Sequence, residues 1–116
     1  MLNVANVVER FANLSGLSGD AVNPWIYICE DSVEEIRSRL RPNVSEEENS
    51  KKLNSAAATL SFYKYVLCIS IKDDLNPENQ YVSNPYTKNL AMTLWNEQKE
   101  EIANLLCDNN FAFKSV

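Results

Sequence analysis

A chain of 116 residues is short enough to fold around one hydrophobic core, which predicts a single domain over residues 1–116. Its 16 acidic and 11 basic residues give a net charge of -5, which disfavours tight or sequence-specific binding to nucleic acid phosphates. Histidine is absent, so the chain lacks the commonest general base and the commonest metal ligand.

The first predicted element is a short amphipathic helix near the start of the chain. A glycine after a helix can adopt the left-handed backbone conformation that ends it, and we expect Gly16 to do so within Ser15-Gly16-Leu17. Five apolar residues recur at helical spacing before this point: Val4, Val7, Val8, Phe11 and Leu14.

A second helix is predicted after a turn at Gly19-Asp20. Asn23 is the expected N-cap and Pro24 the first helical residue, since proline has no amide hydrogen to leave unpaired there. The helix should end at Arg41, because Pro42 disfavours helical geometry in the residue before it. Its apolar stripe is Trp25, Cys29, Val33, Ile36 and Leu40.

The third predicted helix begins at Ser45-Glu46-Glu47-Glu48, which has the pattern of a capping box, and runs to about Ile71. From Leu60 onward it is apolar nearly all round, which indicates either the central helix of a bundle or a helix buried in an oligomer. A strand is the alternative interpretation of its β-branched and aromatic end.

Residues 72–85 have the composition of a long loop, and the last helix is expected to start at about Asn84-Pro85 and to end near Cys107. The tail from Phe111 to Val116 alternates at period two, and we expect it to dock on its own bundle or on a neighbouring subunit. The predicted stripe of the last helix is Leu90, Leu94, Gln98, Ile102 and Leu105, with Trp95 and Leu106 beside it.

These elements predict an all-α fold. It is a small bundle of about four helices, with a long loop before the last helix and a short extended C-terminal tail. The longest unbroken apolar run, residues 65–71, has seven residues and is too short for a bilayer helix, which needs about 20. This predicts that the protein is not a membrane protein.

Cysteine usage and the N-terminus indicate an intracellular protein. The three cysteines, Cys29, Cys68 and Cys107, cannot all pair within one chain, which favours a reducing compartment. The first residues, Met1 to Val4, lack the positive region and apolar core of a secretory signal, which favours an intracellular protein unless such a signal was already removed.

The carboxylates form three clusters, but their positions do not predict a catalytic or metal site. Residues 46–48 are explained by a helix N-terminus, and Glu97, Glu100 and Glu101 by a solvated helix face. Asp73-Asp74 lacks the spacing of a calcium loop. We therefore expect neither an enzyme nor a bound metal or cofactor.

Seven residues are candidates for a contact with a subunit or partner. The arginines of one basic cluster either complement the C-terminal dipole of the second helix or bind a partner's carboxylates or phosphates. Four aromatic residues that flank the helices either anchor an interface or pack locally. These residues are Arg37, Arg39, Arg41, Tyr81, Tyr86, Phe111 and Phe113.

The order of these segments resembles a family of phage proteins. The features that carry the resemblance are a first helix ending in Leu14-Ser15-Gly16-Leu17, a second opening with Trp25, a third containing the run from Asn54 to Tyr65, and a terminal Phe111-Ala112-Phe113. In order and length they resemble the head–tail connector, or head-completion adaptor, proteins of tailed bacteriophages and prophages. The resemblance spans most of the chain.

The resemblance implies a structural role in virion assembly. Many copies would form a ring between the portal and the tail, and the partners would be further copies of the chain and portal or tail-completion proteins. Such a protein would lie in the host cytoplasm during assembly and then in the virion. The alternative is a small helical interaction or regulatory module of a prophage, without catalytic activity.

Overall fold

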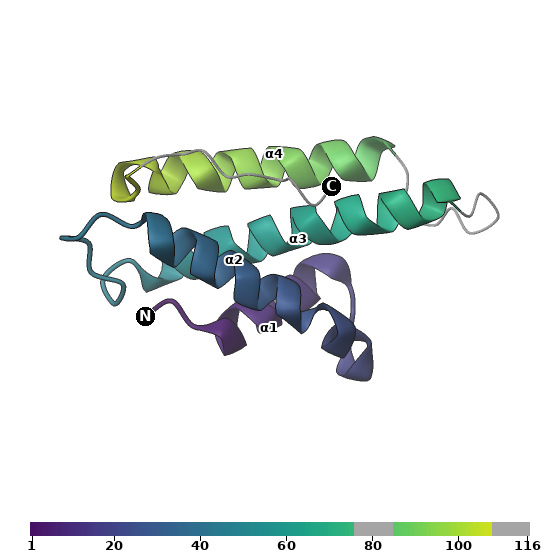
Figure 1. Ribbon diagram of the computed structural model, residues 1–116, viewed down its shortest axis with the longest axis horizontal. Helices are drawn as coiled ribbons and strands as arrows, with labels where there is room; N and C mark the ends of the chain where they lie inside the picture. The colour runs from purple at the N-terminus through teal and green to yellow at the C-terminus, as the bar shows by residue number, and fades with distance from the viewer. Residues whose placement is uncertain (76–84, 108–116) are drawn as a thin grey trace.

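The computed structural model describes the backbone of residues 1–75 and 85–107 and the side chains of residues 1–70 and 87–107. This part of the chain folds into an all-α bundle, as predicted, and its one β contact is an isolated bridge between Leu40 and Leu106 (Figure 1). The elements are α1 (Val4–Ser15), the 3-10 helix η1 (Gly19–Trp25), α2 (Ile26–Arg39), α3 (Ser50–Leu75), α4 (Pro85–Ile102) and the 3-10 helix η3 (Ala103–Leu105).

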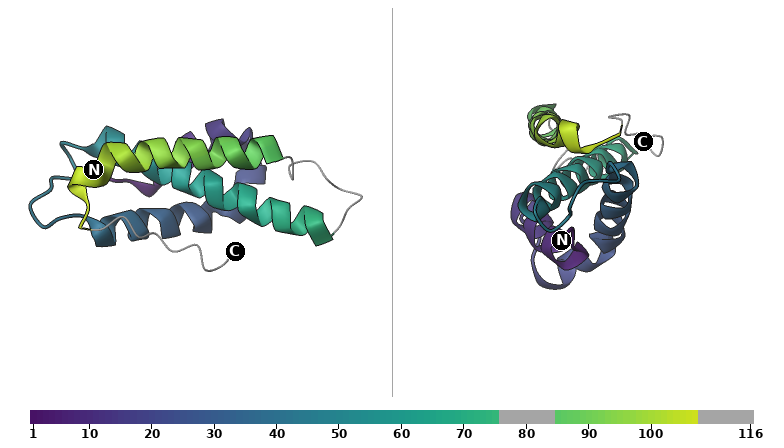
Figure 2. Two further views of the ribbon diagram at one scale, coloured as in Figure 1. Left: turned by 90° about the horizontal axis from the view of Figure 1, so that it is seen from above. Right: turned by 90° about the vertical axis from the view of Figure 1, so that its left-hand side faces the viewer.

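α3 is the central helix. It packs against α1, α2 and α4, while α1 and α2 also pack against each other. α4 lies on the opposite side of α3 from α1, and among the described α-helices it packs extensively only against α3 (Figures 1 and 2). The central-helix interpretation is therefore confirmed. The strand alternative is wrong, because the β-branched and aromatic segment continues the same helix.

α1 forms and ends as its sequence predicts. The side chain of Asn3 accepts a hydrogen bond from the Asn6 amide and so caps the first turn. Gly16 has a φ of 76°, in the left-handed region, and its amide donates to the Ala12 carbonyl. Val7 and Phe11 are fully buried, and the ring of Phe11 meets that of Tyr65 on α3 edge-on at 5.6 Å.

The predicted ends of α2 are both wrong. Asn23 and Pro24 lie inside η1, and α2 begins only at Ile26. Its last residue is Arg39 instead of Arg41, because Leu40 turns to an extended conformation with φ -66° and ψ 142°. This extended residue forms the bridge with Leu106, so a contact distant in sequence ends the helix before Pro42 can.

α3 is displaced toward the C-terminus relative to its prediction. Ser45 Oγ does accept a hydrogen bond from the Glu48 amide (3.2 Å), but this caps a separate turn, and α3 starts at Ser50. At the other end α3 continues to Leu75, so the first four residues of the predicted 72–85 loop are helical. No glycine or proline interrupts the helix until Pro77. Residues 76–84 lie outside the described residues.

α4 begins at Pro85, near the predicted start, and the face that it buries is only partly the predicted one: Ile102 of the predicted stripe and Trp95 beside it are buried, but Leu90 is not. Leu90 is 43% exposed, whereas Trp95 is 1% exposed and Ala91 and Ile102 are fully buried. The α-helix ends at Ile102, before the predicted Cys107, and continues as η3. The tail from Phe111 to Val116 lies outside the described residues. Within the described part, no helix has the length and apolarity to cross a membrane.

Candidate functional site

Arg37 binds within its own chain. Its Nε and Nη2 donate to the two carboxylate oxygens of Glu46 at 3.1 and 3.3 Å, and Nη2 also donates to the Leu2 carbonyl at 2.8 Å. A weaker contact of 3.5 Å joins it to Glu34 on the previous turn of α2. The guanidinium therefore ties α2 to the N-terminal segment and to the turn that precedes α3.

The Arg37–Glu46 pair shifts both ionisation equilibria toward the charged forms. The hydrogen bond from Arg37 lowers the pKa of the Glu46 carboxyl below its ordinary value of 4.5, and the positive charge of Arg37 adds to this effect. Conversely, the hydrogen bond to Glu46 raises the pKa of Arg37. Both side chains keep some exposure, so we expect their attraction to be modest.

Replacing Glu46 with glutamine should lower the free energy of unfolding at neutral pH by about 1 kcal/mol or less. The pKa of Glu46 is lowered in the folded state, so its carboxylate stabilises the fold fully at pH values above the ordinary glutamate pKa. This stabilisation is lost as the pH falls through the lowered pKa of the folded state. Urea unfolding across this pH range gives the free energy of unfolding of the unchanged protein and of Glu46→Gln. The two free energies should become equal at acidic pH. The control Glu47→Gln, at an exposed neighbour, should change stability by less than about 0.5 kcal/mol. A constant difference at all pH values would contradict this role.

Arg39 and Arg41 also make contacts within the chain. Nη1 of Arg39 donates to the Glu35 carbonyl at 3.1 Å, in the last turn of α2. Nε of Arg41 donates to the Leu106 carbonyl at 3.0 Å. Arg37 thus holds the N-terminal segment at Leu2 against α2, and Arg41 binds the backbone of Leu106 after η3, contacts that the linear sequence did not show. Tyr81, Phe111 and Phe113 lie outside the described residues, and Tyr86 lies on α4 without a described side chain.

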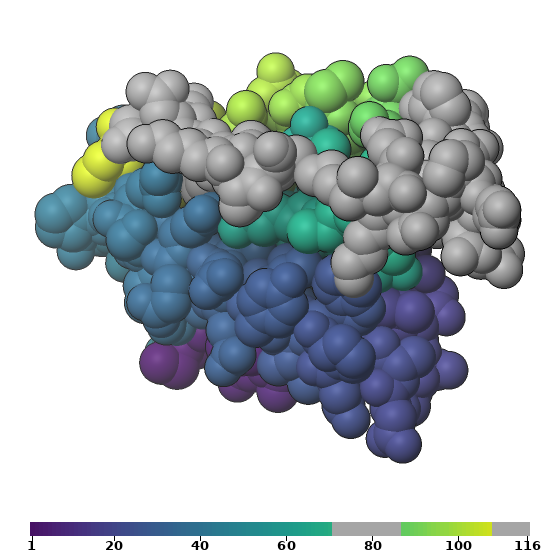
Figure 3. All heavy atoms as spheres, turned by 45° about the vertical axis from the view of Figure 1, so that its right-hand side comes forward, coloured from purple at the N-terminus to yellow at the C-terminus, as the bar shows by residue number. Residues whose placement is uncertain are grey.

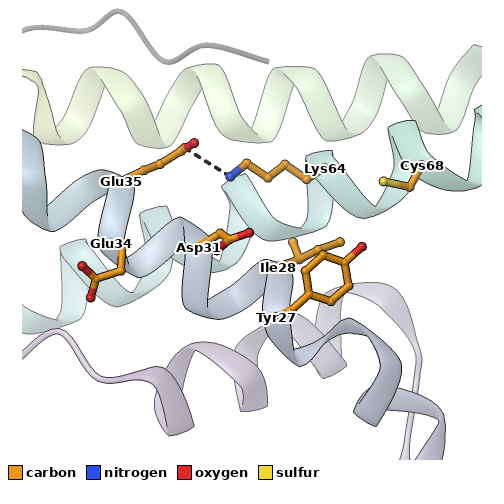
Figure 4. A pocket seen from close by; sticks show the side chains of 7 residues that line it. All are labelled: Tyr27, Ile28, Asp31, Glu34, Glu35, Lys64 and Cys68. Atoms are coloured by element: carbon orange, nitrogen blue, oxygen red, sulfur yellow. Dashed lines mark ion pairs between the residues drawn. The ribbon is translucent and has the colours of Figure 1, made fainter. Parts of the chain in front are cut away.

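The α2–α3 groove is a surface depression with a volume of about 500 Å³. Lys64 of α3 and Glu35 of α2 point toward each other across it, with 3.2 Å between Nζ and Oε2 (Figure 4). Ile28 is buried beneath it, while Tyr27 is 53% exposed. The groove is lined by Tyr27, Ile28, Asp31, Glu34, Glu35, Lys64 and Cys68.

The second depression, which we call the α1–α4 valley, lies over α3 between its two neighbours and measures about 330 Å³. Its apolar walls are Leu14, which is 39% exposed, and the half-buried Leu94. Arg10 closes one side by donating to Ser55 Oγ at 2.8 Å. The valley is lined by Arg10, Asn13, Leu14, Ser55, Ala58, Thr59, Leu94 and Gln98.

The described residues contain no group of three or more cysteine, aspartate or glutamate side chains that could hold a metal ion. Burial raises the pKa of the Cys29 thiol, which keeps it protonated and weakly nucleophilic. The α2–α3 groove is acidic and has an exposed aromatic ring at its edge, whereas the α1–α4 valley has apolar walls.

Sequence reasoning missed both depressions. The i, i+4 spacing of Leu90 and Leu94 was a visible signal and was assigned to the core, but only Leu94 packs against the core, whereas Leu90 is exposed. Comparison of the chain with protein-family models, with curated proteins and with solved structures found no match.

Proposed function

We propose that this chain is a structural subunit of a phage head–tail connector, which forms a ring between portal and tail and has no catalytic activity. It would assemble in the host cytoplasm and remain in the virion. The order of helices that resembles this family supports the proposal, and so does the distribution of apolar and charged groups on the surface.

The observation that carries the proposal is the incomplete packing of α4. Among the described α-helices this helix packs extensively only on α3, and it exposes Leu90, at 43%. Leu94, one turn after Leu90, lines the α1–α4 valley opposite Leu14. Apolar side chains gathered beside such a valley are typical of a surface that a protein partner covers.

A closed ring needs two different surfaces on each subunit, because each copy meets its neighbours head to tail. The α1–α4 valley supplies an apolar surface. The exposed carboxylates of α2, Glu30, Asp31 and Glu34, lie on a different helix, which covers much of the face shown in Figure 3. A subunit of net charge -5 is also suited to a channel through which DNA slides without being held.

Native mass spectrometry and negative-stain imaging of the purified chain test the proposal, alone and with the portal protein of the genome that encodes it. We expect an oligomer of the size of a ring, either from the purified chain alone or after the portal protein is added. A protein that stays a monomer or dimer and does not bind portal would overturn the connector role and favour the regulatory module.

Within such a ring, Leu90→Glu should weaken assembly strongly. Burying a leucine contributes about 1.5–3 kcal/mol, so each contact should weaken by about tenfold or more. The measurement is the concentration at which rings form, by native mass spectrometry. The matched control is Asn96→Glu, which adds the same charge at another exposed position of α4. Equal assembly of both variants would exclude this face of α4 as an interface.

A further inference from the structure

One end of the α1–α4 valley is basic. Lys51 and Lys52 are exposed in the first turn of α3, four and three residues before Ser55 of the valley floor, so they share its side of the helix. The guanidinium of Arg10 binds Ser55 from α1. Among the described residues, none of these three cations forms an ion pair. We call Arg10, Lys51 and Lys52 the basic end of the valley.

The valley also contains a hydrogen-bond acceptor that lacks a donor. Oε1 of Gln98 is buried, and no group in the part of the chain that the structure describes donates to it. A buried acceptor without a donor destabilises the free subunit. The valley therefore suits an occupant that brings a donor together with apolar surface, and negative charge for the basic end.

The exposed side of α2 has this chemistry. The ring of Tyr27 is 53% exposed and carries a hydroxyl that can donate. Three exposed carboxylates follow it at the i+3, i+4 and i+7 spacing of a single helix face, and Figure 4 shows two of them along α2. We call this set the α2 face: Tyr27, Glu30, Asp31 and Glu34.

The α2 face and the valley also agree in length. Tyr27 and Glu34 are seven residues apart, which is a rise of about 10.5 Å along α2. Thr59 of the valley floor and Lys52 are also seven residues apart, so the rise along α3 is the same. A second copy's α2, laid antiparallel to α3, would place its ring in the apolar part of the valley and its carboxylates at the basic end.

The two surfaces lie on opposite sides of α3. The α2 face borders the α2–α3 groove, where α3 contributes Lys64. Lys64 follows Ser55 by nine residues, which is a rotation of about 180° around the helix. The end view in Figure 2 likewise shows α2 and α4 on different sides of α3. One subunit can therefore offer its α2 face to one neighbour and its valley to another, as a head-to-tail assembly requires.

We propose that the α2 face of one copy docks into the α1–α4 valley of a second copy. The Tyr27 ring lies between the apolar walls, its hydroxyl donates to Oε1 of Gln98, and the carboxylates lie beside the basic end. The opposite charges select the orientation in which the two copies meet. This inference rests on the proposed head-to-tail ring and names the two surfaces that form its contact.

Reversing the charges of each surface in turn tests this contact. Glu30→Lys/Asp31→Lys makes the α2 face basic, and Lys51→Glu/Lys52→Glu makes the end of the valley acidic; all four positions are exposed. Like charges meet in either variant alone, so association between copies should weaken by at least about tenfold, as measured by sedimentation velocity. An equal mixture of the two variants should restore association, because every contact between them joins opposite charges.

The matched control is Asp20→Lys/Glu100→Lys, which changes the net charge by the same amount at exposed positions outside both surfaces. It should associate like the unchanged chain. A mixture that associates no better than its two components, each shown by circular dichroism to be folded, would overturn the inference and leave the ring to the measurement on the unchanged chain. Restored association without binding to portal would support the contact and overturn the connector role.

The hydroxyl of Tyr27 provides a second test. Tyr27→Phe keeps the ring and removes the donor, so association should weaken by about fivefold. In a Gln98→Leu background the same substitution should have no effect, because the acceptor is absent. A loss of equal size in both backgrounds would overturn the pairing of Tyr27 with Gln98.

Discussion

Replacing Trp95 with alanine should lower the free energy of unfolding by about 3–5 kcal/mol, the largest single effect that we expect in this chain. Trp95 is 1% exposed and lies at the middle of the face that α4 buries against α3. Removing the indole leaves a cavity that two helices cannot close without moving. Urea unfolding followed by circular dichroism measures the loss.

The control for Trp95 is Leu90→Ala on the same helix. Leu90 is part of the stripe predicted from sequence, yet it is exposed, so its truncation should cost less than about 1 kcal/mol in the isolated subunit. If the two substitutions had equal effects, the orientation of α4 on α3 described above would be wrong.

Enlarging Ala57 to leucine should also destabilise the bundle, by about 1–3 kcal/mol. Ala56, Ala57 and Ala58 are all at most 1% exposed, and successive residues of a helix point about 100° apart. α3 is therefore covered from three directions at this level. The three added carbon atoms cannot be accommodated without displacing a neighbouring helix.

The control for Ala57 is Lys52→Leu, which places the same side chain at an exposed position of α3. We expect it to change the free energy of unfolding by less than about 0.5 kcal/mol in the same urea experiment. Tolerance of leucine at Ala57 would show that the helices leave space around the alanine run.

Hydrophobic periodicity and capping residues predicted well where helices form, because both signals depend only on residues that are close together in the sequence. The apolar spacing of α1 predicted the helix, and the glycine that follows it was sufficient to predict its C-terminal end. The ends of α2 could not be predicted in this way. Its C-terminus is set by Leu106, a residue more than sixty positions away, whose bridge holds Leu40 in an extended conformation.

The face that α4 buries was predicted only in part, for a related reason. Its sequence carries two overlapping apolar stripes, one through Leu90 and Leu94 and one through Ala91 and Trp95. Only the packing on α3 selects the second stripe for burial. For the arginine cluster, Arg39 does donate to a carbonyl of the last turn of α2, while the contacts of Arg37 with Leu2 and of Arg41 with Leu106 join residues too distant in sequence to be predicted.

The placement of α4 on one side of α3 has a consequence for the order of events during synthesis. α1, η1, α2 and α3 are complete by residue 75, and these helices pack on one another without α4. They leave the ribosome first, so their shared core can form while α4 is still being translated. α4 would then dock last, and its arrival would cover a face of α3 that the nascent chain exposes to chaperones.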